Sequence, residues 1–299
     1  MSRSCVYSDV VTRQPLRLAI LEAARILADA GVPSPRVDAE ELAAHVLGVR
    51  RDRLALTPLA DTGDIERLRK LVEQRAKRIP LQHILGTAAM GSIEVAVGNG
   101  VFVPRPETEQ LLDWALRRIA EVPQPLVFDL CTGSGALALA IAHERPDARV
   151  CALELDKVAL AWARHNADAC AAAGDRRVEL YAGDVSNPRL FTEFEGMADL
   201  VVCNPPYIPE GAELEPEVRH DPTQALFAGA DGLEVIRSVV RVAARLLREG
   251  GALAIEHDDS NGDGVAGLLS ARRVLTEVTG HTDLAGKPRF VTAIRTTST

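Results

Sequence analysis

The residues best suited to chemistry are four consecutive ones, Asn204, Pro205, Pro206 and Tyr207. They follow a short apolar run, residues 200–203, which predicts a buried strand. Proline cannot donate a ladder hydrogen bond, so the two prolines end this strand. Because parallel α/β sheets bind ligands at the carboxyl ends of their strands, we expect Asn204 at a ligand-binding edge.

Asn204 and Pro205 offer two neighbouring hydrogen-bond acceptors, a side-chain carbonyl and a backbone carbonyl. Two acceptors that converge on one NH2 group suit an amide or amino substrate, whose nitrogen is a poor nucleophile because its lone pair is delocalised. They favour a pyramidal nitrogen as an electrophile approaches, and this stabilisation is greatest in the transition state. The ring of Tyr207 is expected to cover the flat substrate group. The alternative is an ordinary Asn-Pro turn.

A glycine-rich turn supplies a second set of candidate residues. Residues 126–130 predict a strand that contains Asp129, and Gly133 and Gly135 follow it at the start of a predicted helix. Glycines let the backbone approach a ligand, and the free amides of a helix N-terminus bind anionic groups. Glu154 lies 21 residues after Gly133, at the end of the next predicted strand, where a carboxylate can accept both hydroxyls of a ribose.

Asp184 and Asn204 follow the third and fourth strands of the same alternation, residues 178–181 and 200–203. With the glycine turn and Glu154, these positions predict a ligand that carries a nucleoside. The glycine turn alone is also compatible with a nicotinamide enzyme or with a simple tight turn.

The elements that position these residues fall into three parts. The first part has helical periodicity and predicts helices over residues 16–30, 35–48 and about 62–79. A β-hairpin is predicted next, with strands over 93–97 and 101–103 and a turn at 98–100, followed by a helix over 107–121. Strands and helices then alternate as in an α/β domain, with a later helix over 232–248, a strand over 252–256 and an antiparallel pair near Val274 and Phe290.

The composition is that of a globular protein, with 47% hydrophobic and 25% charged residues in a chain of 299. The formal net charge of -8 disfavours direct binding to a nucleic-acid backbone. No apolar run approaches a membrane span, and the cysteines lack the spacing of a metal site or a disulfide framework. We therefore expect a cytoplasmic monomer with no metal. The cysteines are Cys5, Cys131, Cys151, Cys170 and Cys203.

Three motifs together resemble one family. They are D-L-C-T-G-S-G at residues 129–135, N-P-P-Y at 204–207 and P-R-P-E-T-E at 104–109. This set closely resembles the peptide chain release factor glutamine methyltransferases, the PrmC or HemK family. The N-P-P-Y motif is shared with adenine-amino DNA methyltransferases, whereas P-R-P-E-T-E before a class I methyltransferase core is far more specific.

The resemblance implies an α/β fold of the class I methyltransferase type. Its Rossmann-like sheet would have seven strands with the last one antiparallel, preceded by a small all-α domain and a hairpin linker. The implied boundaries are a helical substrate-docking domain over 1–85, the linker over 86–104 and the methyltransferase domain over 105–299.

The resemblance also implies the roles of individual residues. The implied cofactor is S-adenosylmethionine, expected at Asp129, Cys131, Thr132, Gly133, Ser134, Gly135, Glu154, Asp184, Val185 and Asn204. The substrate glutamine is expected at Asn204, Pro205, Pro206, Tyr207, Arg105 and Glu107, with Asn204, Pro205 and Tyr207 as the catalytic residues. The sequence departs from the family at Cys131, where many methyltransferases have glycine, and at residues 89–93, which lack aromatic side chains.

The implied reaction is direct methyl transfer to the side-chain amide nitrogen of the glutamine in the Gly-Gly-Gln loop of class 1 release factors. A helical part beside a site for an amide is consistent with a macromolecular substrate that is held at a second place. The alternatives are an amino methyltransferase that acts on nucleic acid or on a ribosomal protein glutamine, a nicotinamide-binding protein, and a binding module without activity.

Overall fold

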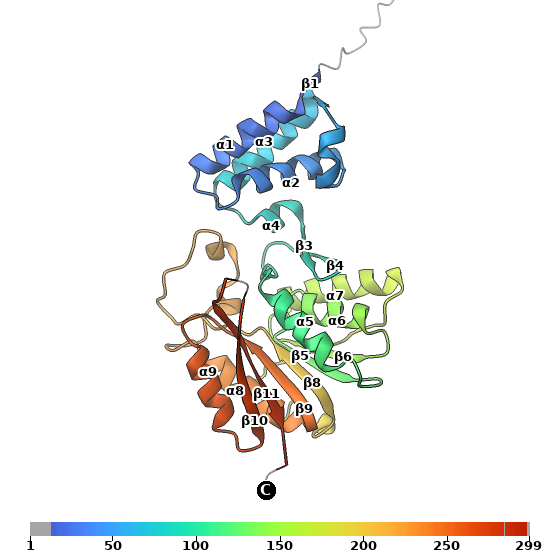
Figure 1. Cartoon of the computed structure of the whole chain (residues 1–299), viewed down its shortest axis with the longest axis vertical. Helices are drawn as coiled ribbons and strands as arrows, with labels where there is room; N and C mark the ends of the chain where they lie inside the picture. Colours follow the sequence, from blue (N-terminus) through green and yellow to red (C-terminus); the bar gives the residue numbers. More distant parts are fainter. Residues whose placement is uncertain (1–12, 284, 298–299) are drawn as a thin grey trace, which may run out of the picture. The chain divides into compact units, whose positions relative to one another are not determined.

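The computed structural model describes residues 13–283 and 285–297 (Figure 1). These residues form two compact units. The first unit contains the described residues up to Leu85 together with Glu215–His220, and the second contains the described residues of Gly86–Leu214 and Asp221–Thr299. Cys5 lies outside the described residues. Along the described chain, none of the helices has both the length and the apolar character that crossing a membrane would require.

The first unit is a helical bundle built on amphipathic faces. Leu16, Ile20 and Leu27 recur at helical spacing on α1 and pack with Leu42 of α2 and Leu68 of α3. The three predicted helices are confirmed, and a short antiparallel pair of strands, β1 and β2, is an element that the sequence did not predict. The elements are β1 (Arg13–Pro15), α1 (Leu16–Asp29), α2 (Pro35–Leu47), η1 (Arg51–Leu56), β2 (Leu59–Asp61), α3 (Thr62–Ala76), α4 (Leu81–Leu85) and η3 (Val218–His220).

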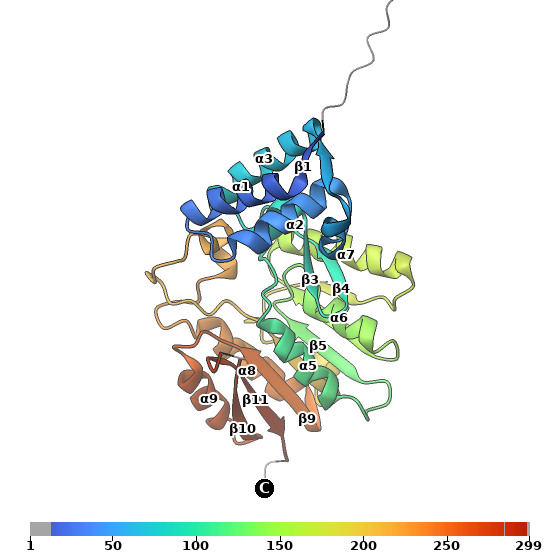
Figure 2. The ribbon, with the colours of Figure 1, turned by 45° about the horizontal axis from the view of Figure 1, so that its top comes forward.

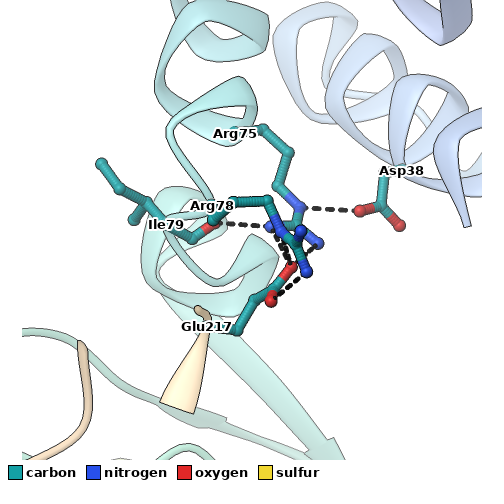
Figure 3. A network of polar contacts seen from close by, with 5 residues as sticks. All are labelled: Asp38, Arg75, Arg78, Ile79 and Glu217. Atoms are coloured by element: carbon teal, nitrogen blue, oxygen red, sulfur yellow. Dashed lines mark hydrogen bonds and ion pairs between the residues drawn. The ribbon is translucent and has the colours of Figure 1, made fainter. Parts of the chain in front are cut away.

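A buried ion-pair network lies in the first unit (Figure 3). The Arg75 side chain is 6% exposed, and its Nε donates to Asp38 Oδ2 at 2.7 Å. Both Nη atoms of Arg75 donate to Glu217 Oε1 at 3.1 Å, and Arg78 donates to both oxygens of the same carboxylate. Burial raises the pKa of Glu217, but the hydrogen bonds from Arg78 and Arg75 outweigh it, and the pKa lies below its ordinary value.

The second unit is built on a seven-stranded sheet with strand order β10-β11-β9-β8-β5-β6-β7. Only β11 runs antiparallel to its neighbours, β9 and β10, so the predicted class I fold with an antiparallel last strand is confirmed. The strands are β5 (Leu126–Leu130), β6 (Arg149–Glu154), β7 (Glu179–Ala182), β8 (Ala198–Cys203), β9 (Leu247–Glu256), β10 (Leu275–Thr282) and β11 (Pro288–Arg295).

Helices cover both faces of this sheet, as the ribbon shows from two directions (Figures 1 and 2). One face packs against α5, α6 and α7 with the hairpin β3–β4, and the other packs against α8 and α9. Successive residues of β5 alternate between the two cores: Val127 lies in the first, and Phe128 in the second. The helices are α5 (Thr108–Arg118), α6 (Ala136–Glu144), α7 (Lys157–Ala173), η2 (Thr192–Phe194), η4 (Thr223–Ala225), α8 (Glu234–Leu246) and α9 (Gly262–Ser270).

The hairpin exists, but the predicted position of its turn was wrong. β3 (Thr87–Met90) pairs with β4 (Ile93–Ala96), so the chain turns at Gly91 and Ser92 rather than at 98–100. A Cβ at Gly98 would lie 2.8 Å from Trp162 Cζ2, and a Cβ at Gly100 would lie 2.7 Å from Val158 Cγ1. These two glycines therefore make room for side chains of α7.

The end of the helix predicted over 232–248 also differs from the structure. α8 ends at Leu246, and β9 begins at Leu247. A Cβ at Gly251 would lie 2.7 Å from the carbonyl oxygen of Ala198, so the glycine allows β9 to run close to the start of β8. The pairing of these two strands therefore extends the sheet into residues that have helical periodicity in the sequence.

Replacement of Arg75 by methionine should destabilise the first unit by about 3 to 5 kcal/mol, because one partner of a buried ion pair is removed and the other stays buried. The group left without its partner is the Asp38 carboxylate, since Glu217 keeps Arg78. Native-state hydrogen exchange of the amides in α2 and α3 measures this decrease in stability. Tryptophan fluorescence does not report on this unit, because Trp114 and Trp162 both lie in the second unit.

The matched control is Arg67→Met, which removes an arginine that is 64% exposed and pairs with Asp64. Its effect should stay within about 0.5 kcal/mol, as for other surface ion pairs. If Arg75→Met and Arg67→Met reduced the stability of the first unit equally, the buried network would contribute no more than a surface ion pair.

Candidate active site

The site lies where four parallel strands end. Leu130 of β5 is paired with Leu153 of β6 and with Cys203 of β8, and Cys203 is paired with Ile255 of β9. The residues that follow these four positions therefore share one edge of the sheet. They are Cys131, Glu154, Asn204 and Glu256.

The glycine turn after β5 has the backbone shape of an anion- or ligand-binding loop. Cys131, Gly133 and Gly135 all have positive φ angles, 64°, 60° and 83°, so Cys131 keeps a conformation that favours glycine. A Cβ added at Gly133 would meet open space, whereas one at Gly135 would lie 3.2 Å from Leu139 Cδ1. The loop is therefore packed against its helix at Gly135 and open at Gly133.

Asn166 of α7 anchors this turn. Its Nδ2 donates to the carbonyl oxygens of Ser134 at 2.9 Å and Ala96 at 3.0 Å, and its Oδ1 accepts from the backbone N–H of Ala96 at 2.8 Å. The side chain is 3% exposed. Asn166 was not among the residues predicted for the site, although it is the one polar residue on the buried face of α7.

Two buried carboxylates flank the turn. Asp129 accepts from Thr132 Oγ1 at 2.5 Å, and burial raises the pKa of Asp129 to about 7. Glu154 accepts from the backbone N–H of Gly133 at 2.7 Å with Oε2 and from that of Asp156 at 2.8 Å with Oε1. Burial raises the pKa of Glu154 as well, while these backbone hydrogen bonds lower it. The carboxylate of Glu154 is thus held in one orientation at the strand end.

Asp184 and Val185 follow β7, the next strand beyond Glu154. Ala182 pairs with Glu154, and the backbone N–H of Gly183 donates to the carbonyl oxygen of Glu154 at 3.0 Å. Asp184 is exposed at the same edge of the sheet, whereas Val185 is buried in the core beneath. The Asp184 side chain therefore faces the exposed edge of the sheet, and the Val185 side chain faces the apolar core.

The segment after β8 is held from several sides. Asn204 is half-buried, and its Nδ2 donates to Thr108 Oγ1 at 3.3 Å. The carbonyl oxygen of Tyr207 accepts from Asn261 Nδ2 at 3.0 Å and approaches Gly232 so closely that a Cβ there would collide with it. Gly232 has a φ of 70°, which also favours glycine. The backbone of the Asn-Pro-Pro-Tyr motif is therefore fixed by partners distant in sequence.

Arg105 and Glu107 lie just before α5. Arg105 donates to the Asp221 carboxylate, which also accepts from the backbone N–H of Val103 at 3.3 Å. The guanidinium carbon lies 4.8 Å from the centre of the Phe102 ring. These contacts give Arg105 a structural role in shaping the segment that carries the motif. The Glu107 side chain is 40% exposed, and its Oε1 lies 3.9 Å from Arg289 Nη2.

Glu256 is a buried carboxylate that was not among the residues predicted for the site. It ends β9, next to the strand that ends before Asn204, and it is 3% exposed. Burial raises its pKa to about 7, while hydrogen bonds from Thr108 and Tyr207 lower it. Burial also raises the pKa of the Tyr207 phenol. A carboxylate at the end of the next apolar strand was the available signal.

The described residues contain no cluster of three side chains that could hold a metal ion. Their four cysteines, Cys131, Cys151, Cys170 and Cys203, are free thiols.

Comparisons with known proteins agree with these two units. Residues 19–86 match the PrmC N-terminal domain, and residues 110–230 match the methyltransferase small domain. The release factor glutamine methyltransferase of Mycolicibacterium smegmatis is 54% identical over 94% of this chain and 98% of its own length. That of Streptomyces coelicolor is 48% identical over 92% of this chain and 96% of its own.

A solved structure shows the same fold at lower identity. The 16S rRNA N2 G1207 methyltransferase of T. Thermophilus, in complex with AdoMet and guanosine, matches 70% of this chain and 49% of its own with a TM-score of 0.50 and 21% identity. The likeness at this level concerns the methyltransferase fold alone. The identity to the bacterial relatives over nearly the whole chain shows that this protein belongs to the release factor glutamine methyltransferase family.

Proposed function

We propose that this protein transfers a methyl group from S-adenosylmethionine to the side-chain amide nitrogen of the glutamine in the Gly-Gly-Gln loop of class 1 release factors. Membership of the family supports the reaction. The observation that carries the assignment is the placement of Asn204 at the end of β8, beside the glycine turn that ends the adjacent strand β5. An amide-binding group and a nucleoside-binding turn thus meet at one edge of the sheet.

The residues at this edge fit S-adenosylmethionine. Each oxygen of Glu154 accepts one backbone hydrogen bond, which leaves lone pairs for the two ribose hydroxyls. The open space over Gly133 allows close approach to the backbone of the turn. We assign cofactor contacts to Asp129, Cys131, Thr132, Gly133, Ser134, Gly135, Glu154, Asp184, Val185 and Asn204.

Asn204 and Pro205 would act on the substrate amide. The Asn204 NH2 group donates to Thr108, which leaves Oδ1 as the acceptor of that side chain. Together with the Pro205 carbonyl it would hold both hydrogens of the glutamine NH2 group and favour the pyramidal nitrogen of the transition state. When bound, S-adenosylmethionine supplies the electrophilic methyl carbon; the amide nitrogen forms the new N–C bond, the S–C bond breaks and one amide proton is lost.

The first unit, with the described residues up to Leu85, would serve as the docking domain for the release factor. Its surface carries large apolar side chains in the open, among them Leu18, Leu21 and Leu56, which are 62%, 46% and 70% exposed. Leu18 and Leu21 lie one turn apart on α1 and share a face. Apolar side chains that neighbour each other on a surface are typical of protein-binding sites. We expect the protein to act in the cytoplasm as a monomer.

The first prediction concerns the cofactor. S-adenosylmethionine should raise the melting temperature of the protein and NADH should not, because only a ligand that binds the folded state stabilises it. Glu154→Gln should weaken S-adenosylmethionine binding about ten- to hundredfold, as expected for the loss of hydrogen bonds to a charged acceptor. Isothermal calorimetry measures both affinities. The control Glu121→Gln, at an exposed position, should bind as the wild type does. Binding of NADH without affinity for S-adenosylmethionine would refute the methyltransferase assignment.

The second prediction concerns Asn204. Asn204→Ala should lower turnover about a hundredfold or more, the usual effect of losing one preorganised hydrogen bond in the transition state. Transfer of labelled methyl groups to intact release factor is the assay, and Asn99→Ala, in an exposed turn, is the control.

The same assay tests the identity of the substrate. Methylation should disappear when the loop glutamine of the release factor is replaced, and DNA should not be labelled. Persistent labelling of the replaced release factor, or labelling of DNA, would contradict the assignment.

The third prediction concerns docking. Leu18→Ser combined with Leu21→Ser should raise the KM for release factor about thirtyfold, because two apolar contacts of roughly 1 kcal/mol each are lost. The turnover number at saturating release factor and the affinity for S-adenosylmethionine should not change. The matched control is Met197→Ser, since Met197 is 51% exposed in the second unit. An unchanged KM in the double variant would remove these two leucines from the docking surface.

A further inference from the structure

One face of α7 follows the chain at the end of the hairpin, residues 96–100, where β4 lies beside the helix (Figures 1 and 2). Val158, Trp162 and Asn166 are spaced four residues apart, so they share this face of α7. Each of them meets one position of residues 96–100, in reverse order along the chain. The pairs are Val158 with Gly100, Trp162 with Gly98 and Asn166 with Ala96. Residues 96–100, the linker segment, are therefore aligned along α7.

Asn166 differs from the other two residues because it also reaches the glycine turn. Its side chain is 3% exposed, and its NH2 group donates to the carbonyl oxygens of Ala96 at 3.0 Å and Ser134 at 2.9 Å. Its Oδ1 accepts from the Ala96 N–H at 2.8 Å. A backbone carbonyl can only accept and a backbone N–H can only donate, so the amide group of Asn166 cannot be reversed. One buried side chain thus holds the linker segment and the turn at once.

The bond to Ser134 fixes a peptide group in the middle of the turn. The Ser134 carbonyl and the Gly135 N–H belong to one planar peptide unit, and the Gly135 N–H donates to the carbonyl oxygen of Thr132 at 2.9 Å. Asn166 holds the other end of this unit. Gly133 and Gly135, on either side of Ser134, have positive φ angles and little conformational preference of their own. The turn therefore depends on such bonds to keep one conformation.

We propose that Asn166 is a positioning residue that couples the binding of S-adenosylmethionine to the order of the linker segment. A ligand that binds the turn stabilises the conformation in which Ser134 meets Asn166, and Asn166 in that position holds Ala96. The coupling is reciprocal, so an ordered linker segment also favours the turn conformation that binds the cofactor. This inference rests on the proposed function, because it takes S-adenosylmethionine as the ligand of the glycine turn.

The position of the linker segment gives this coupling a functional consequence. In chain order, the linker segment lies between the hairpin and residues 104–109, the motif before α5. The resemblance to the family assigns Arg105 and Glu107 of this motif to the substrate glutamine. Cofactor binding therefore orders the chain that leads into the substrate part of the site.

The first test measures cofactor affinity and turnover in two full-length variants. Asn166→Leu removes all three hydrogen bonds, and Asn166→Asp keeps an acceptor for the Ala96 N–H but loses both donors. Each should raise the Kd for S-adenosylmethionine about ten- to hundredfold, because only a minor fraction of the protein keeps the turn in its binding conformation. Since excess cofactor selects that conformation, kcat at saturating S-adenosylmethionine should stay near the wild-type value. Wild-type affinity in both variants, with or without a loss of kcat, would overturn the proposal.

The matched control is Ala167→Gly, at the next residue of α7, which is 8% exposed. Glycine destabilises a helix interior, but this change leaves the three hydrogen bonds of Asn166 in place. Ala167→Gly should bind S-adenosylmethionine as the wild type does. An equal loss of affinity in Ala167→Gly would overturn the proposal, because it would trace the effect to the stability of α7.

Amide hydrogen exchange measures the coupling without a substrate. In the wild type, saturating S-adenosylmethionine should slow exchange several-fold in residues 93–103 as well as in the turn, residues 131–137. In Asn166→Leu with saturating cofactor, exchange in the turn should still be slowed, whereas exchange in residues 93–103 should not respond. An equal response of residues 93–103 in both proteins would overturn the role of Asn166.

The two proposals fail in different ways. A release factor methyltransferase whose residues 93–103 ignore the bound cofactor would overturn the coupling and leave the proposed function intact. A protein whose residues 93–103 respond to S-adenosylmethionine through Asn166, but which leaves release factor unmodified, would instead refute the proposed function and support the coupling.

Discussion

The site depends on one constraint, the register of the parallel strands β5, β6, β8 and β9. Backbone hydrogen bonds align Leu130, Leu153, Cys203 and Ile255, so the next residue of each strand emerges at the same level. A shift by one residue would turn every side chain to the other face. Successive residues of these strands are buried in two separate apolar cores, so such a shift is very unfavourable because each side chain would enter the core in which it does not fit. The cores thus fix the register, and the register brings the functional groups together.

This edge concentrates carboxylates that the core would otherwise exclude. Asp129, Glu154 and Glu256 are each less than a tenth exposed, and burial raises the pKa of each. Their partners differ in kind. Glu154 accepts from two backbone N–H groups, Asp129 accepts from the Thr132 hydroxyl, and Oε2 of Glu256 has no hydrogen-bond partner among the described residues. A backbone N–H can only donate, so the two amides of Gly133 and Asp156 hold the Glu154 carboxylate in its ionised form.

Periodicity and turn chemistry in the sequence predicted most of the fold. The helices of the first unit, the parallel strands and the antiparallel late pair follow from apolar spacing, and the edge position of Asn204 follows from the prolines after it. The hairpin turn was misplaced because Gly98 and Gly100 look like turn residues, whereas they make room for Trp162 and Val158 of a distant helix. A sequence gives the type of a residue, but not the element that will pack on it.

The same limit explains why some residues at the site could not be predicted. Glu256 becomes a neighbour of Asn204 only because β9 lies beside β8, and Thr108 reaches Asn204 only because α5 packs on the same face of the sheet. Neither fact follows from local spacing. Asn166 likewise gains its role from three backbone partners in two other segments.

The loop after Tyr207, residues 208–231, includes a segment that belongs to the first unit. Residues 208–210 are held within the second unit: Ile208 bonds to the backbone of Leu226 and Ala228, and the Glu210 N–H donates to the carbonyl oxygen of Gly229 at 2.9 Å. Residues 215–220 belong to the first unit, where Glu217 binds two arginines. The segment leaves and rejoins the second unit through residues that are hydrogen-bonded within that unit, next to Tyr207 and before α8. The geometry of the motif is thus set by Gly232 and Asn261 rather than by the helical unit.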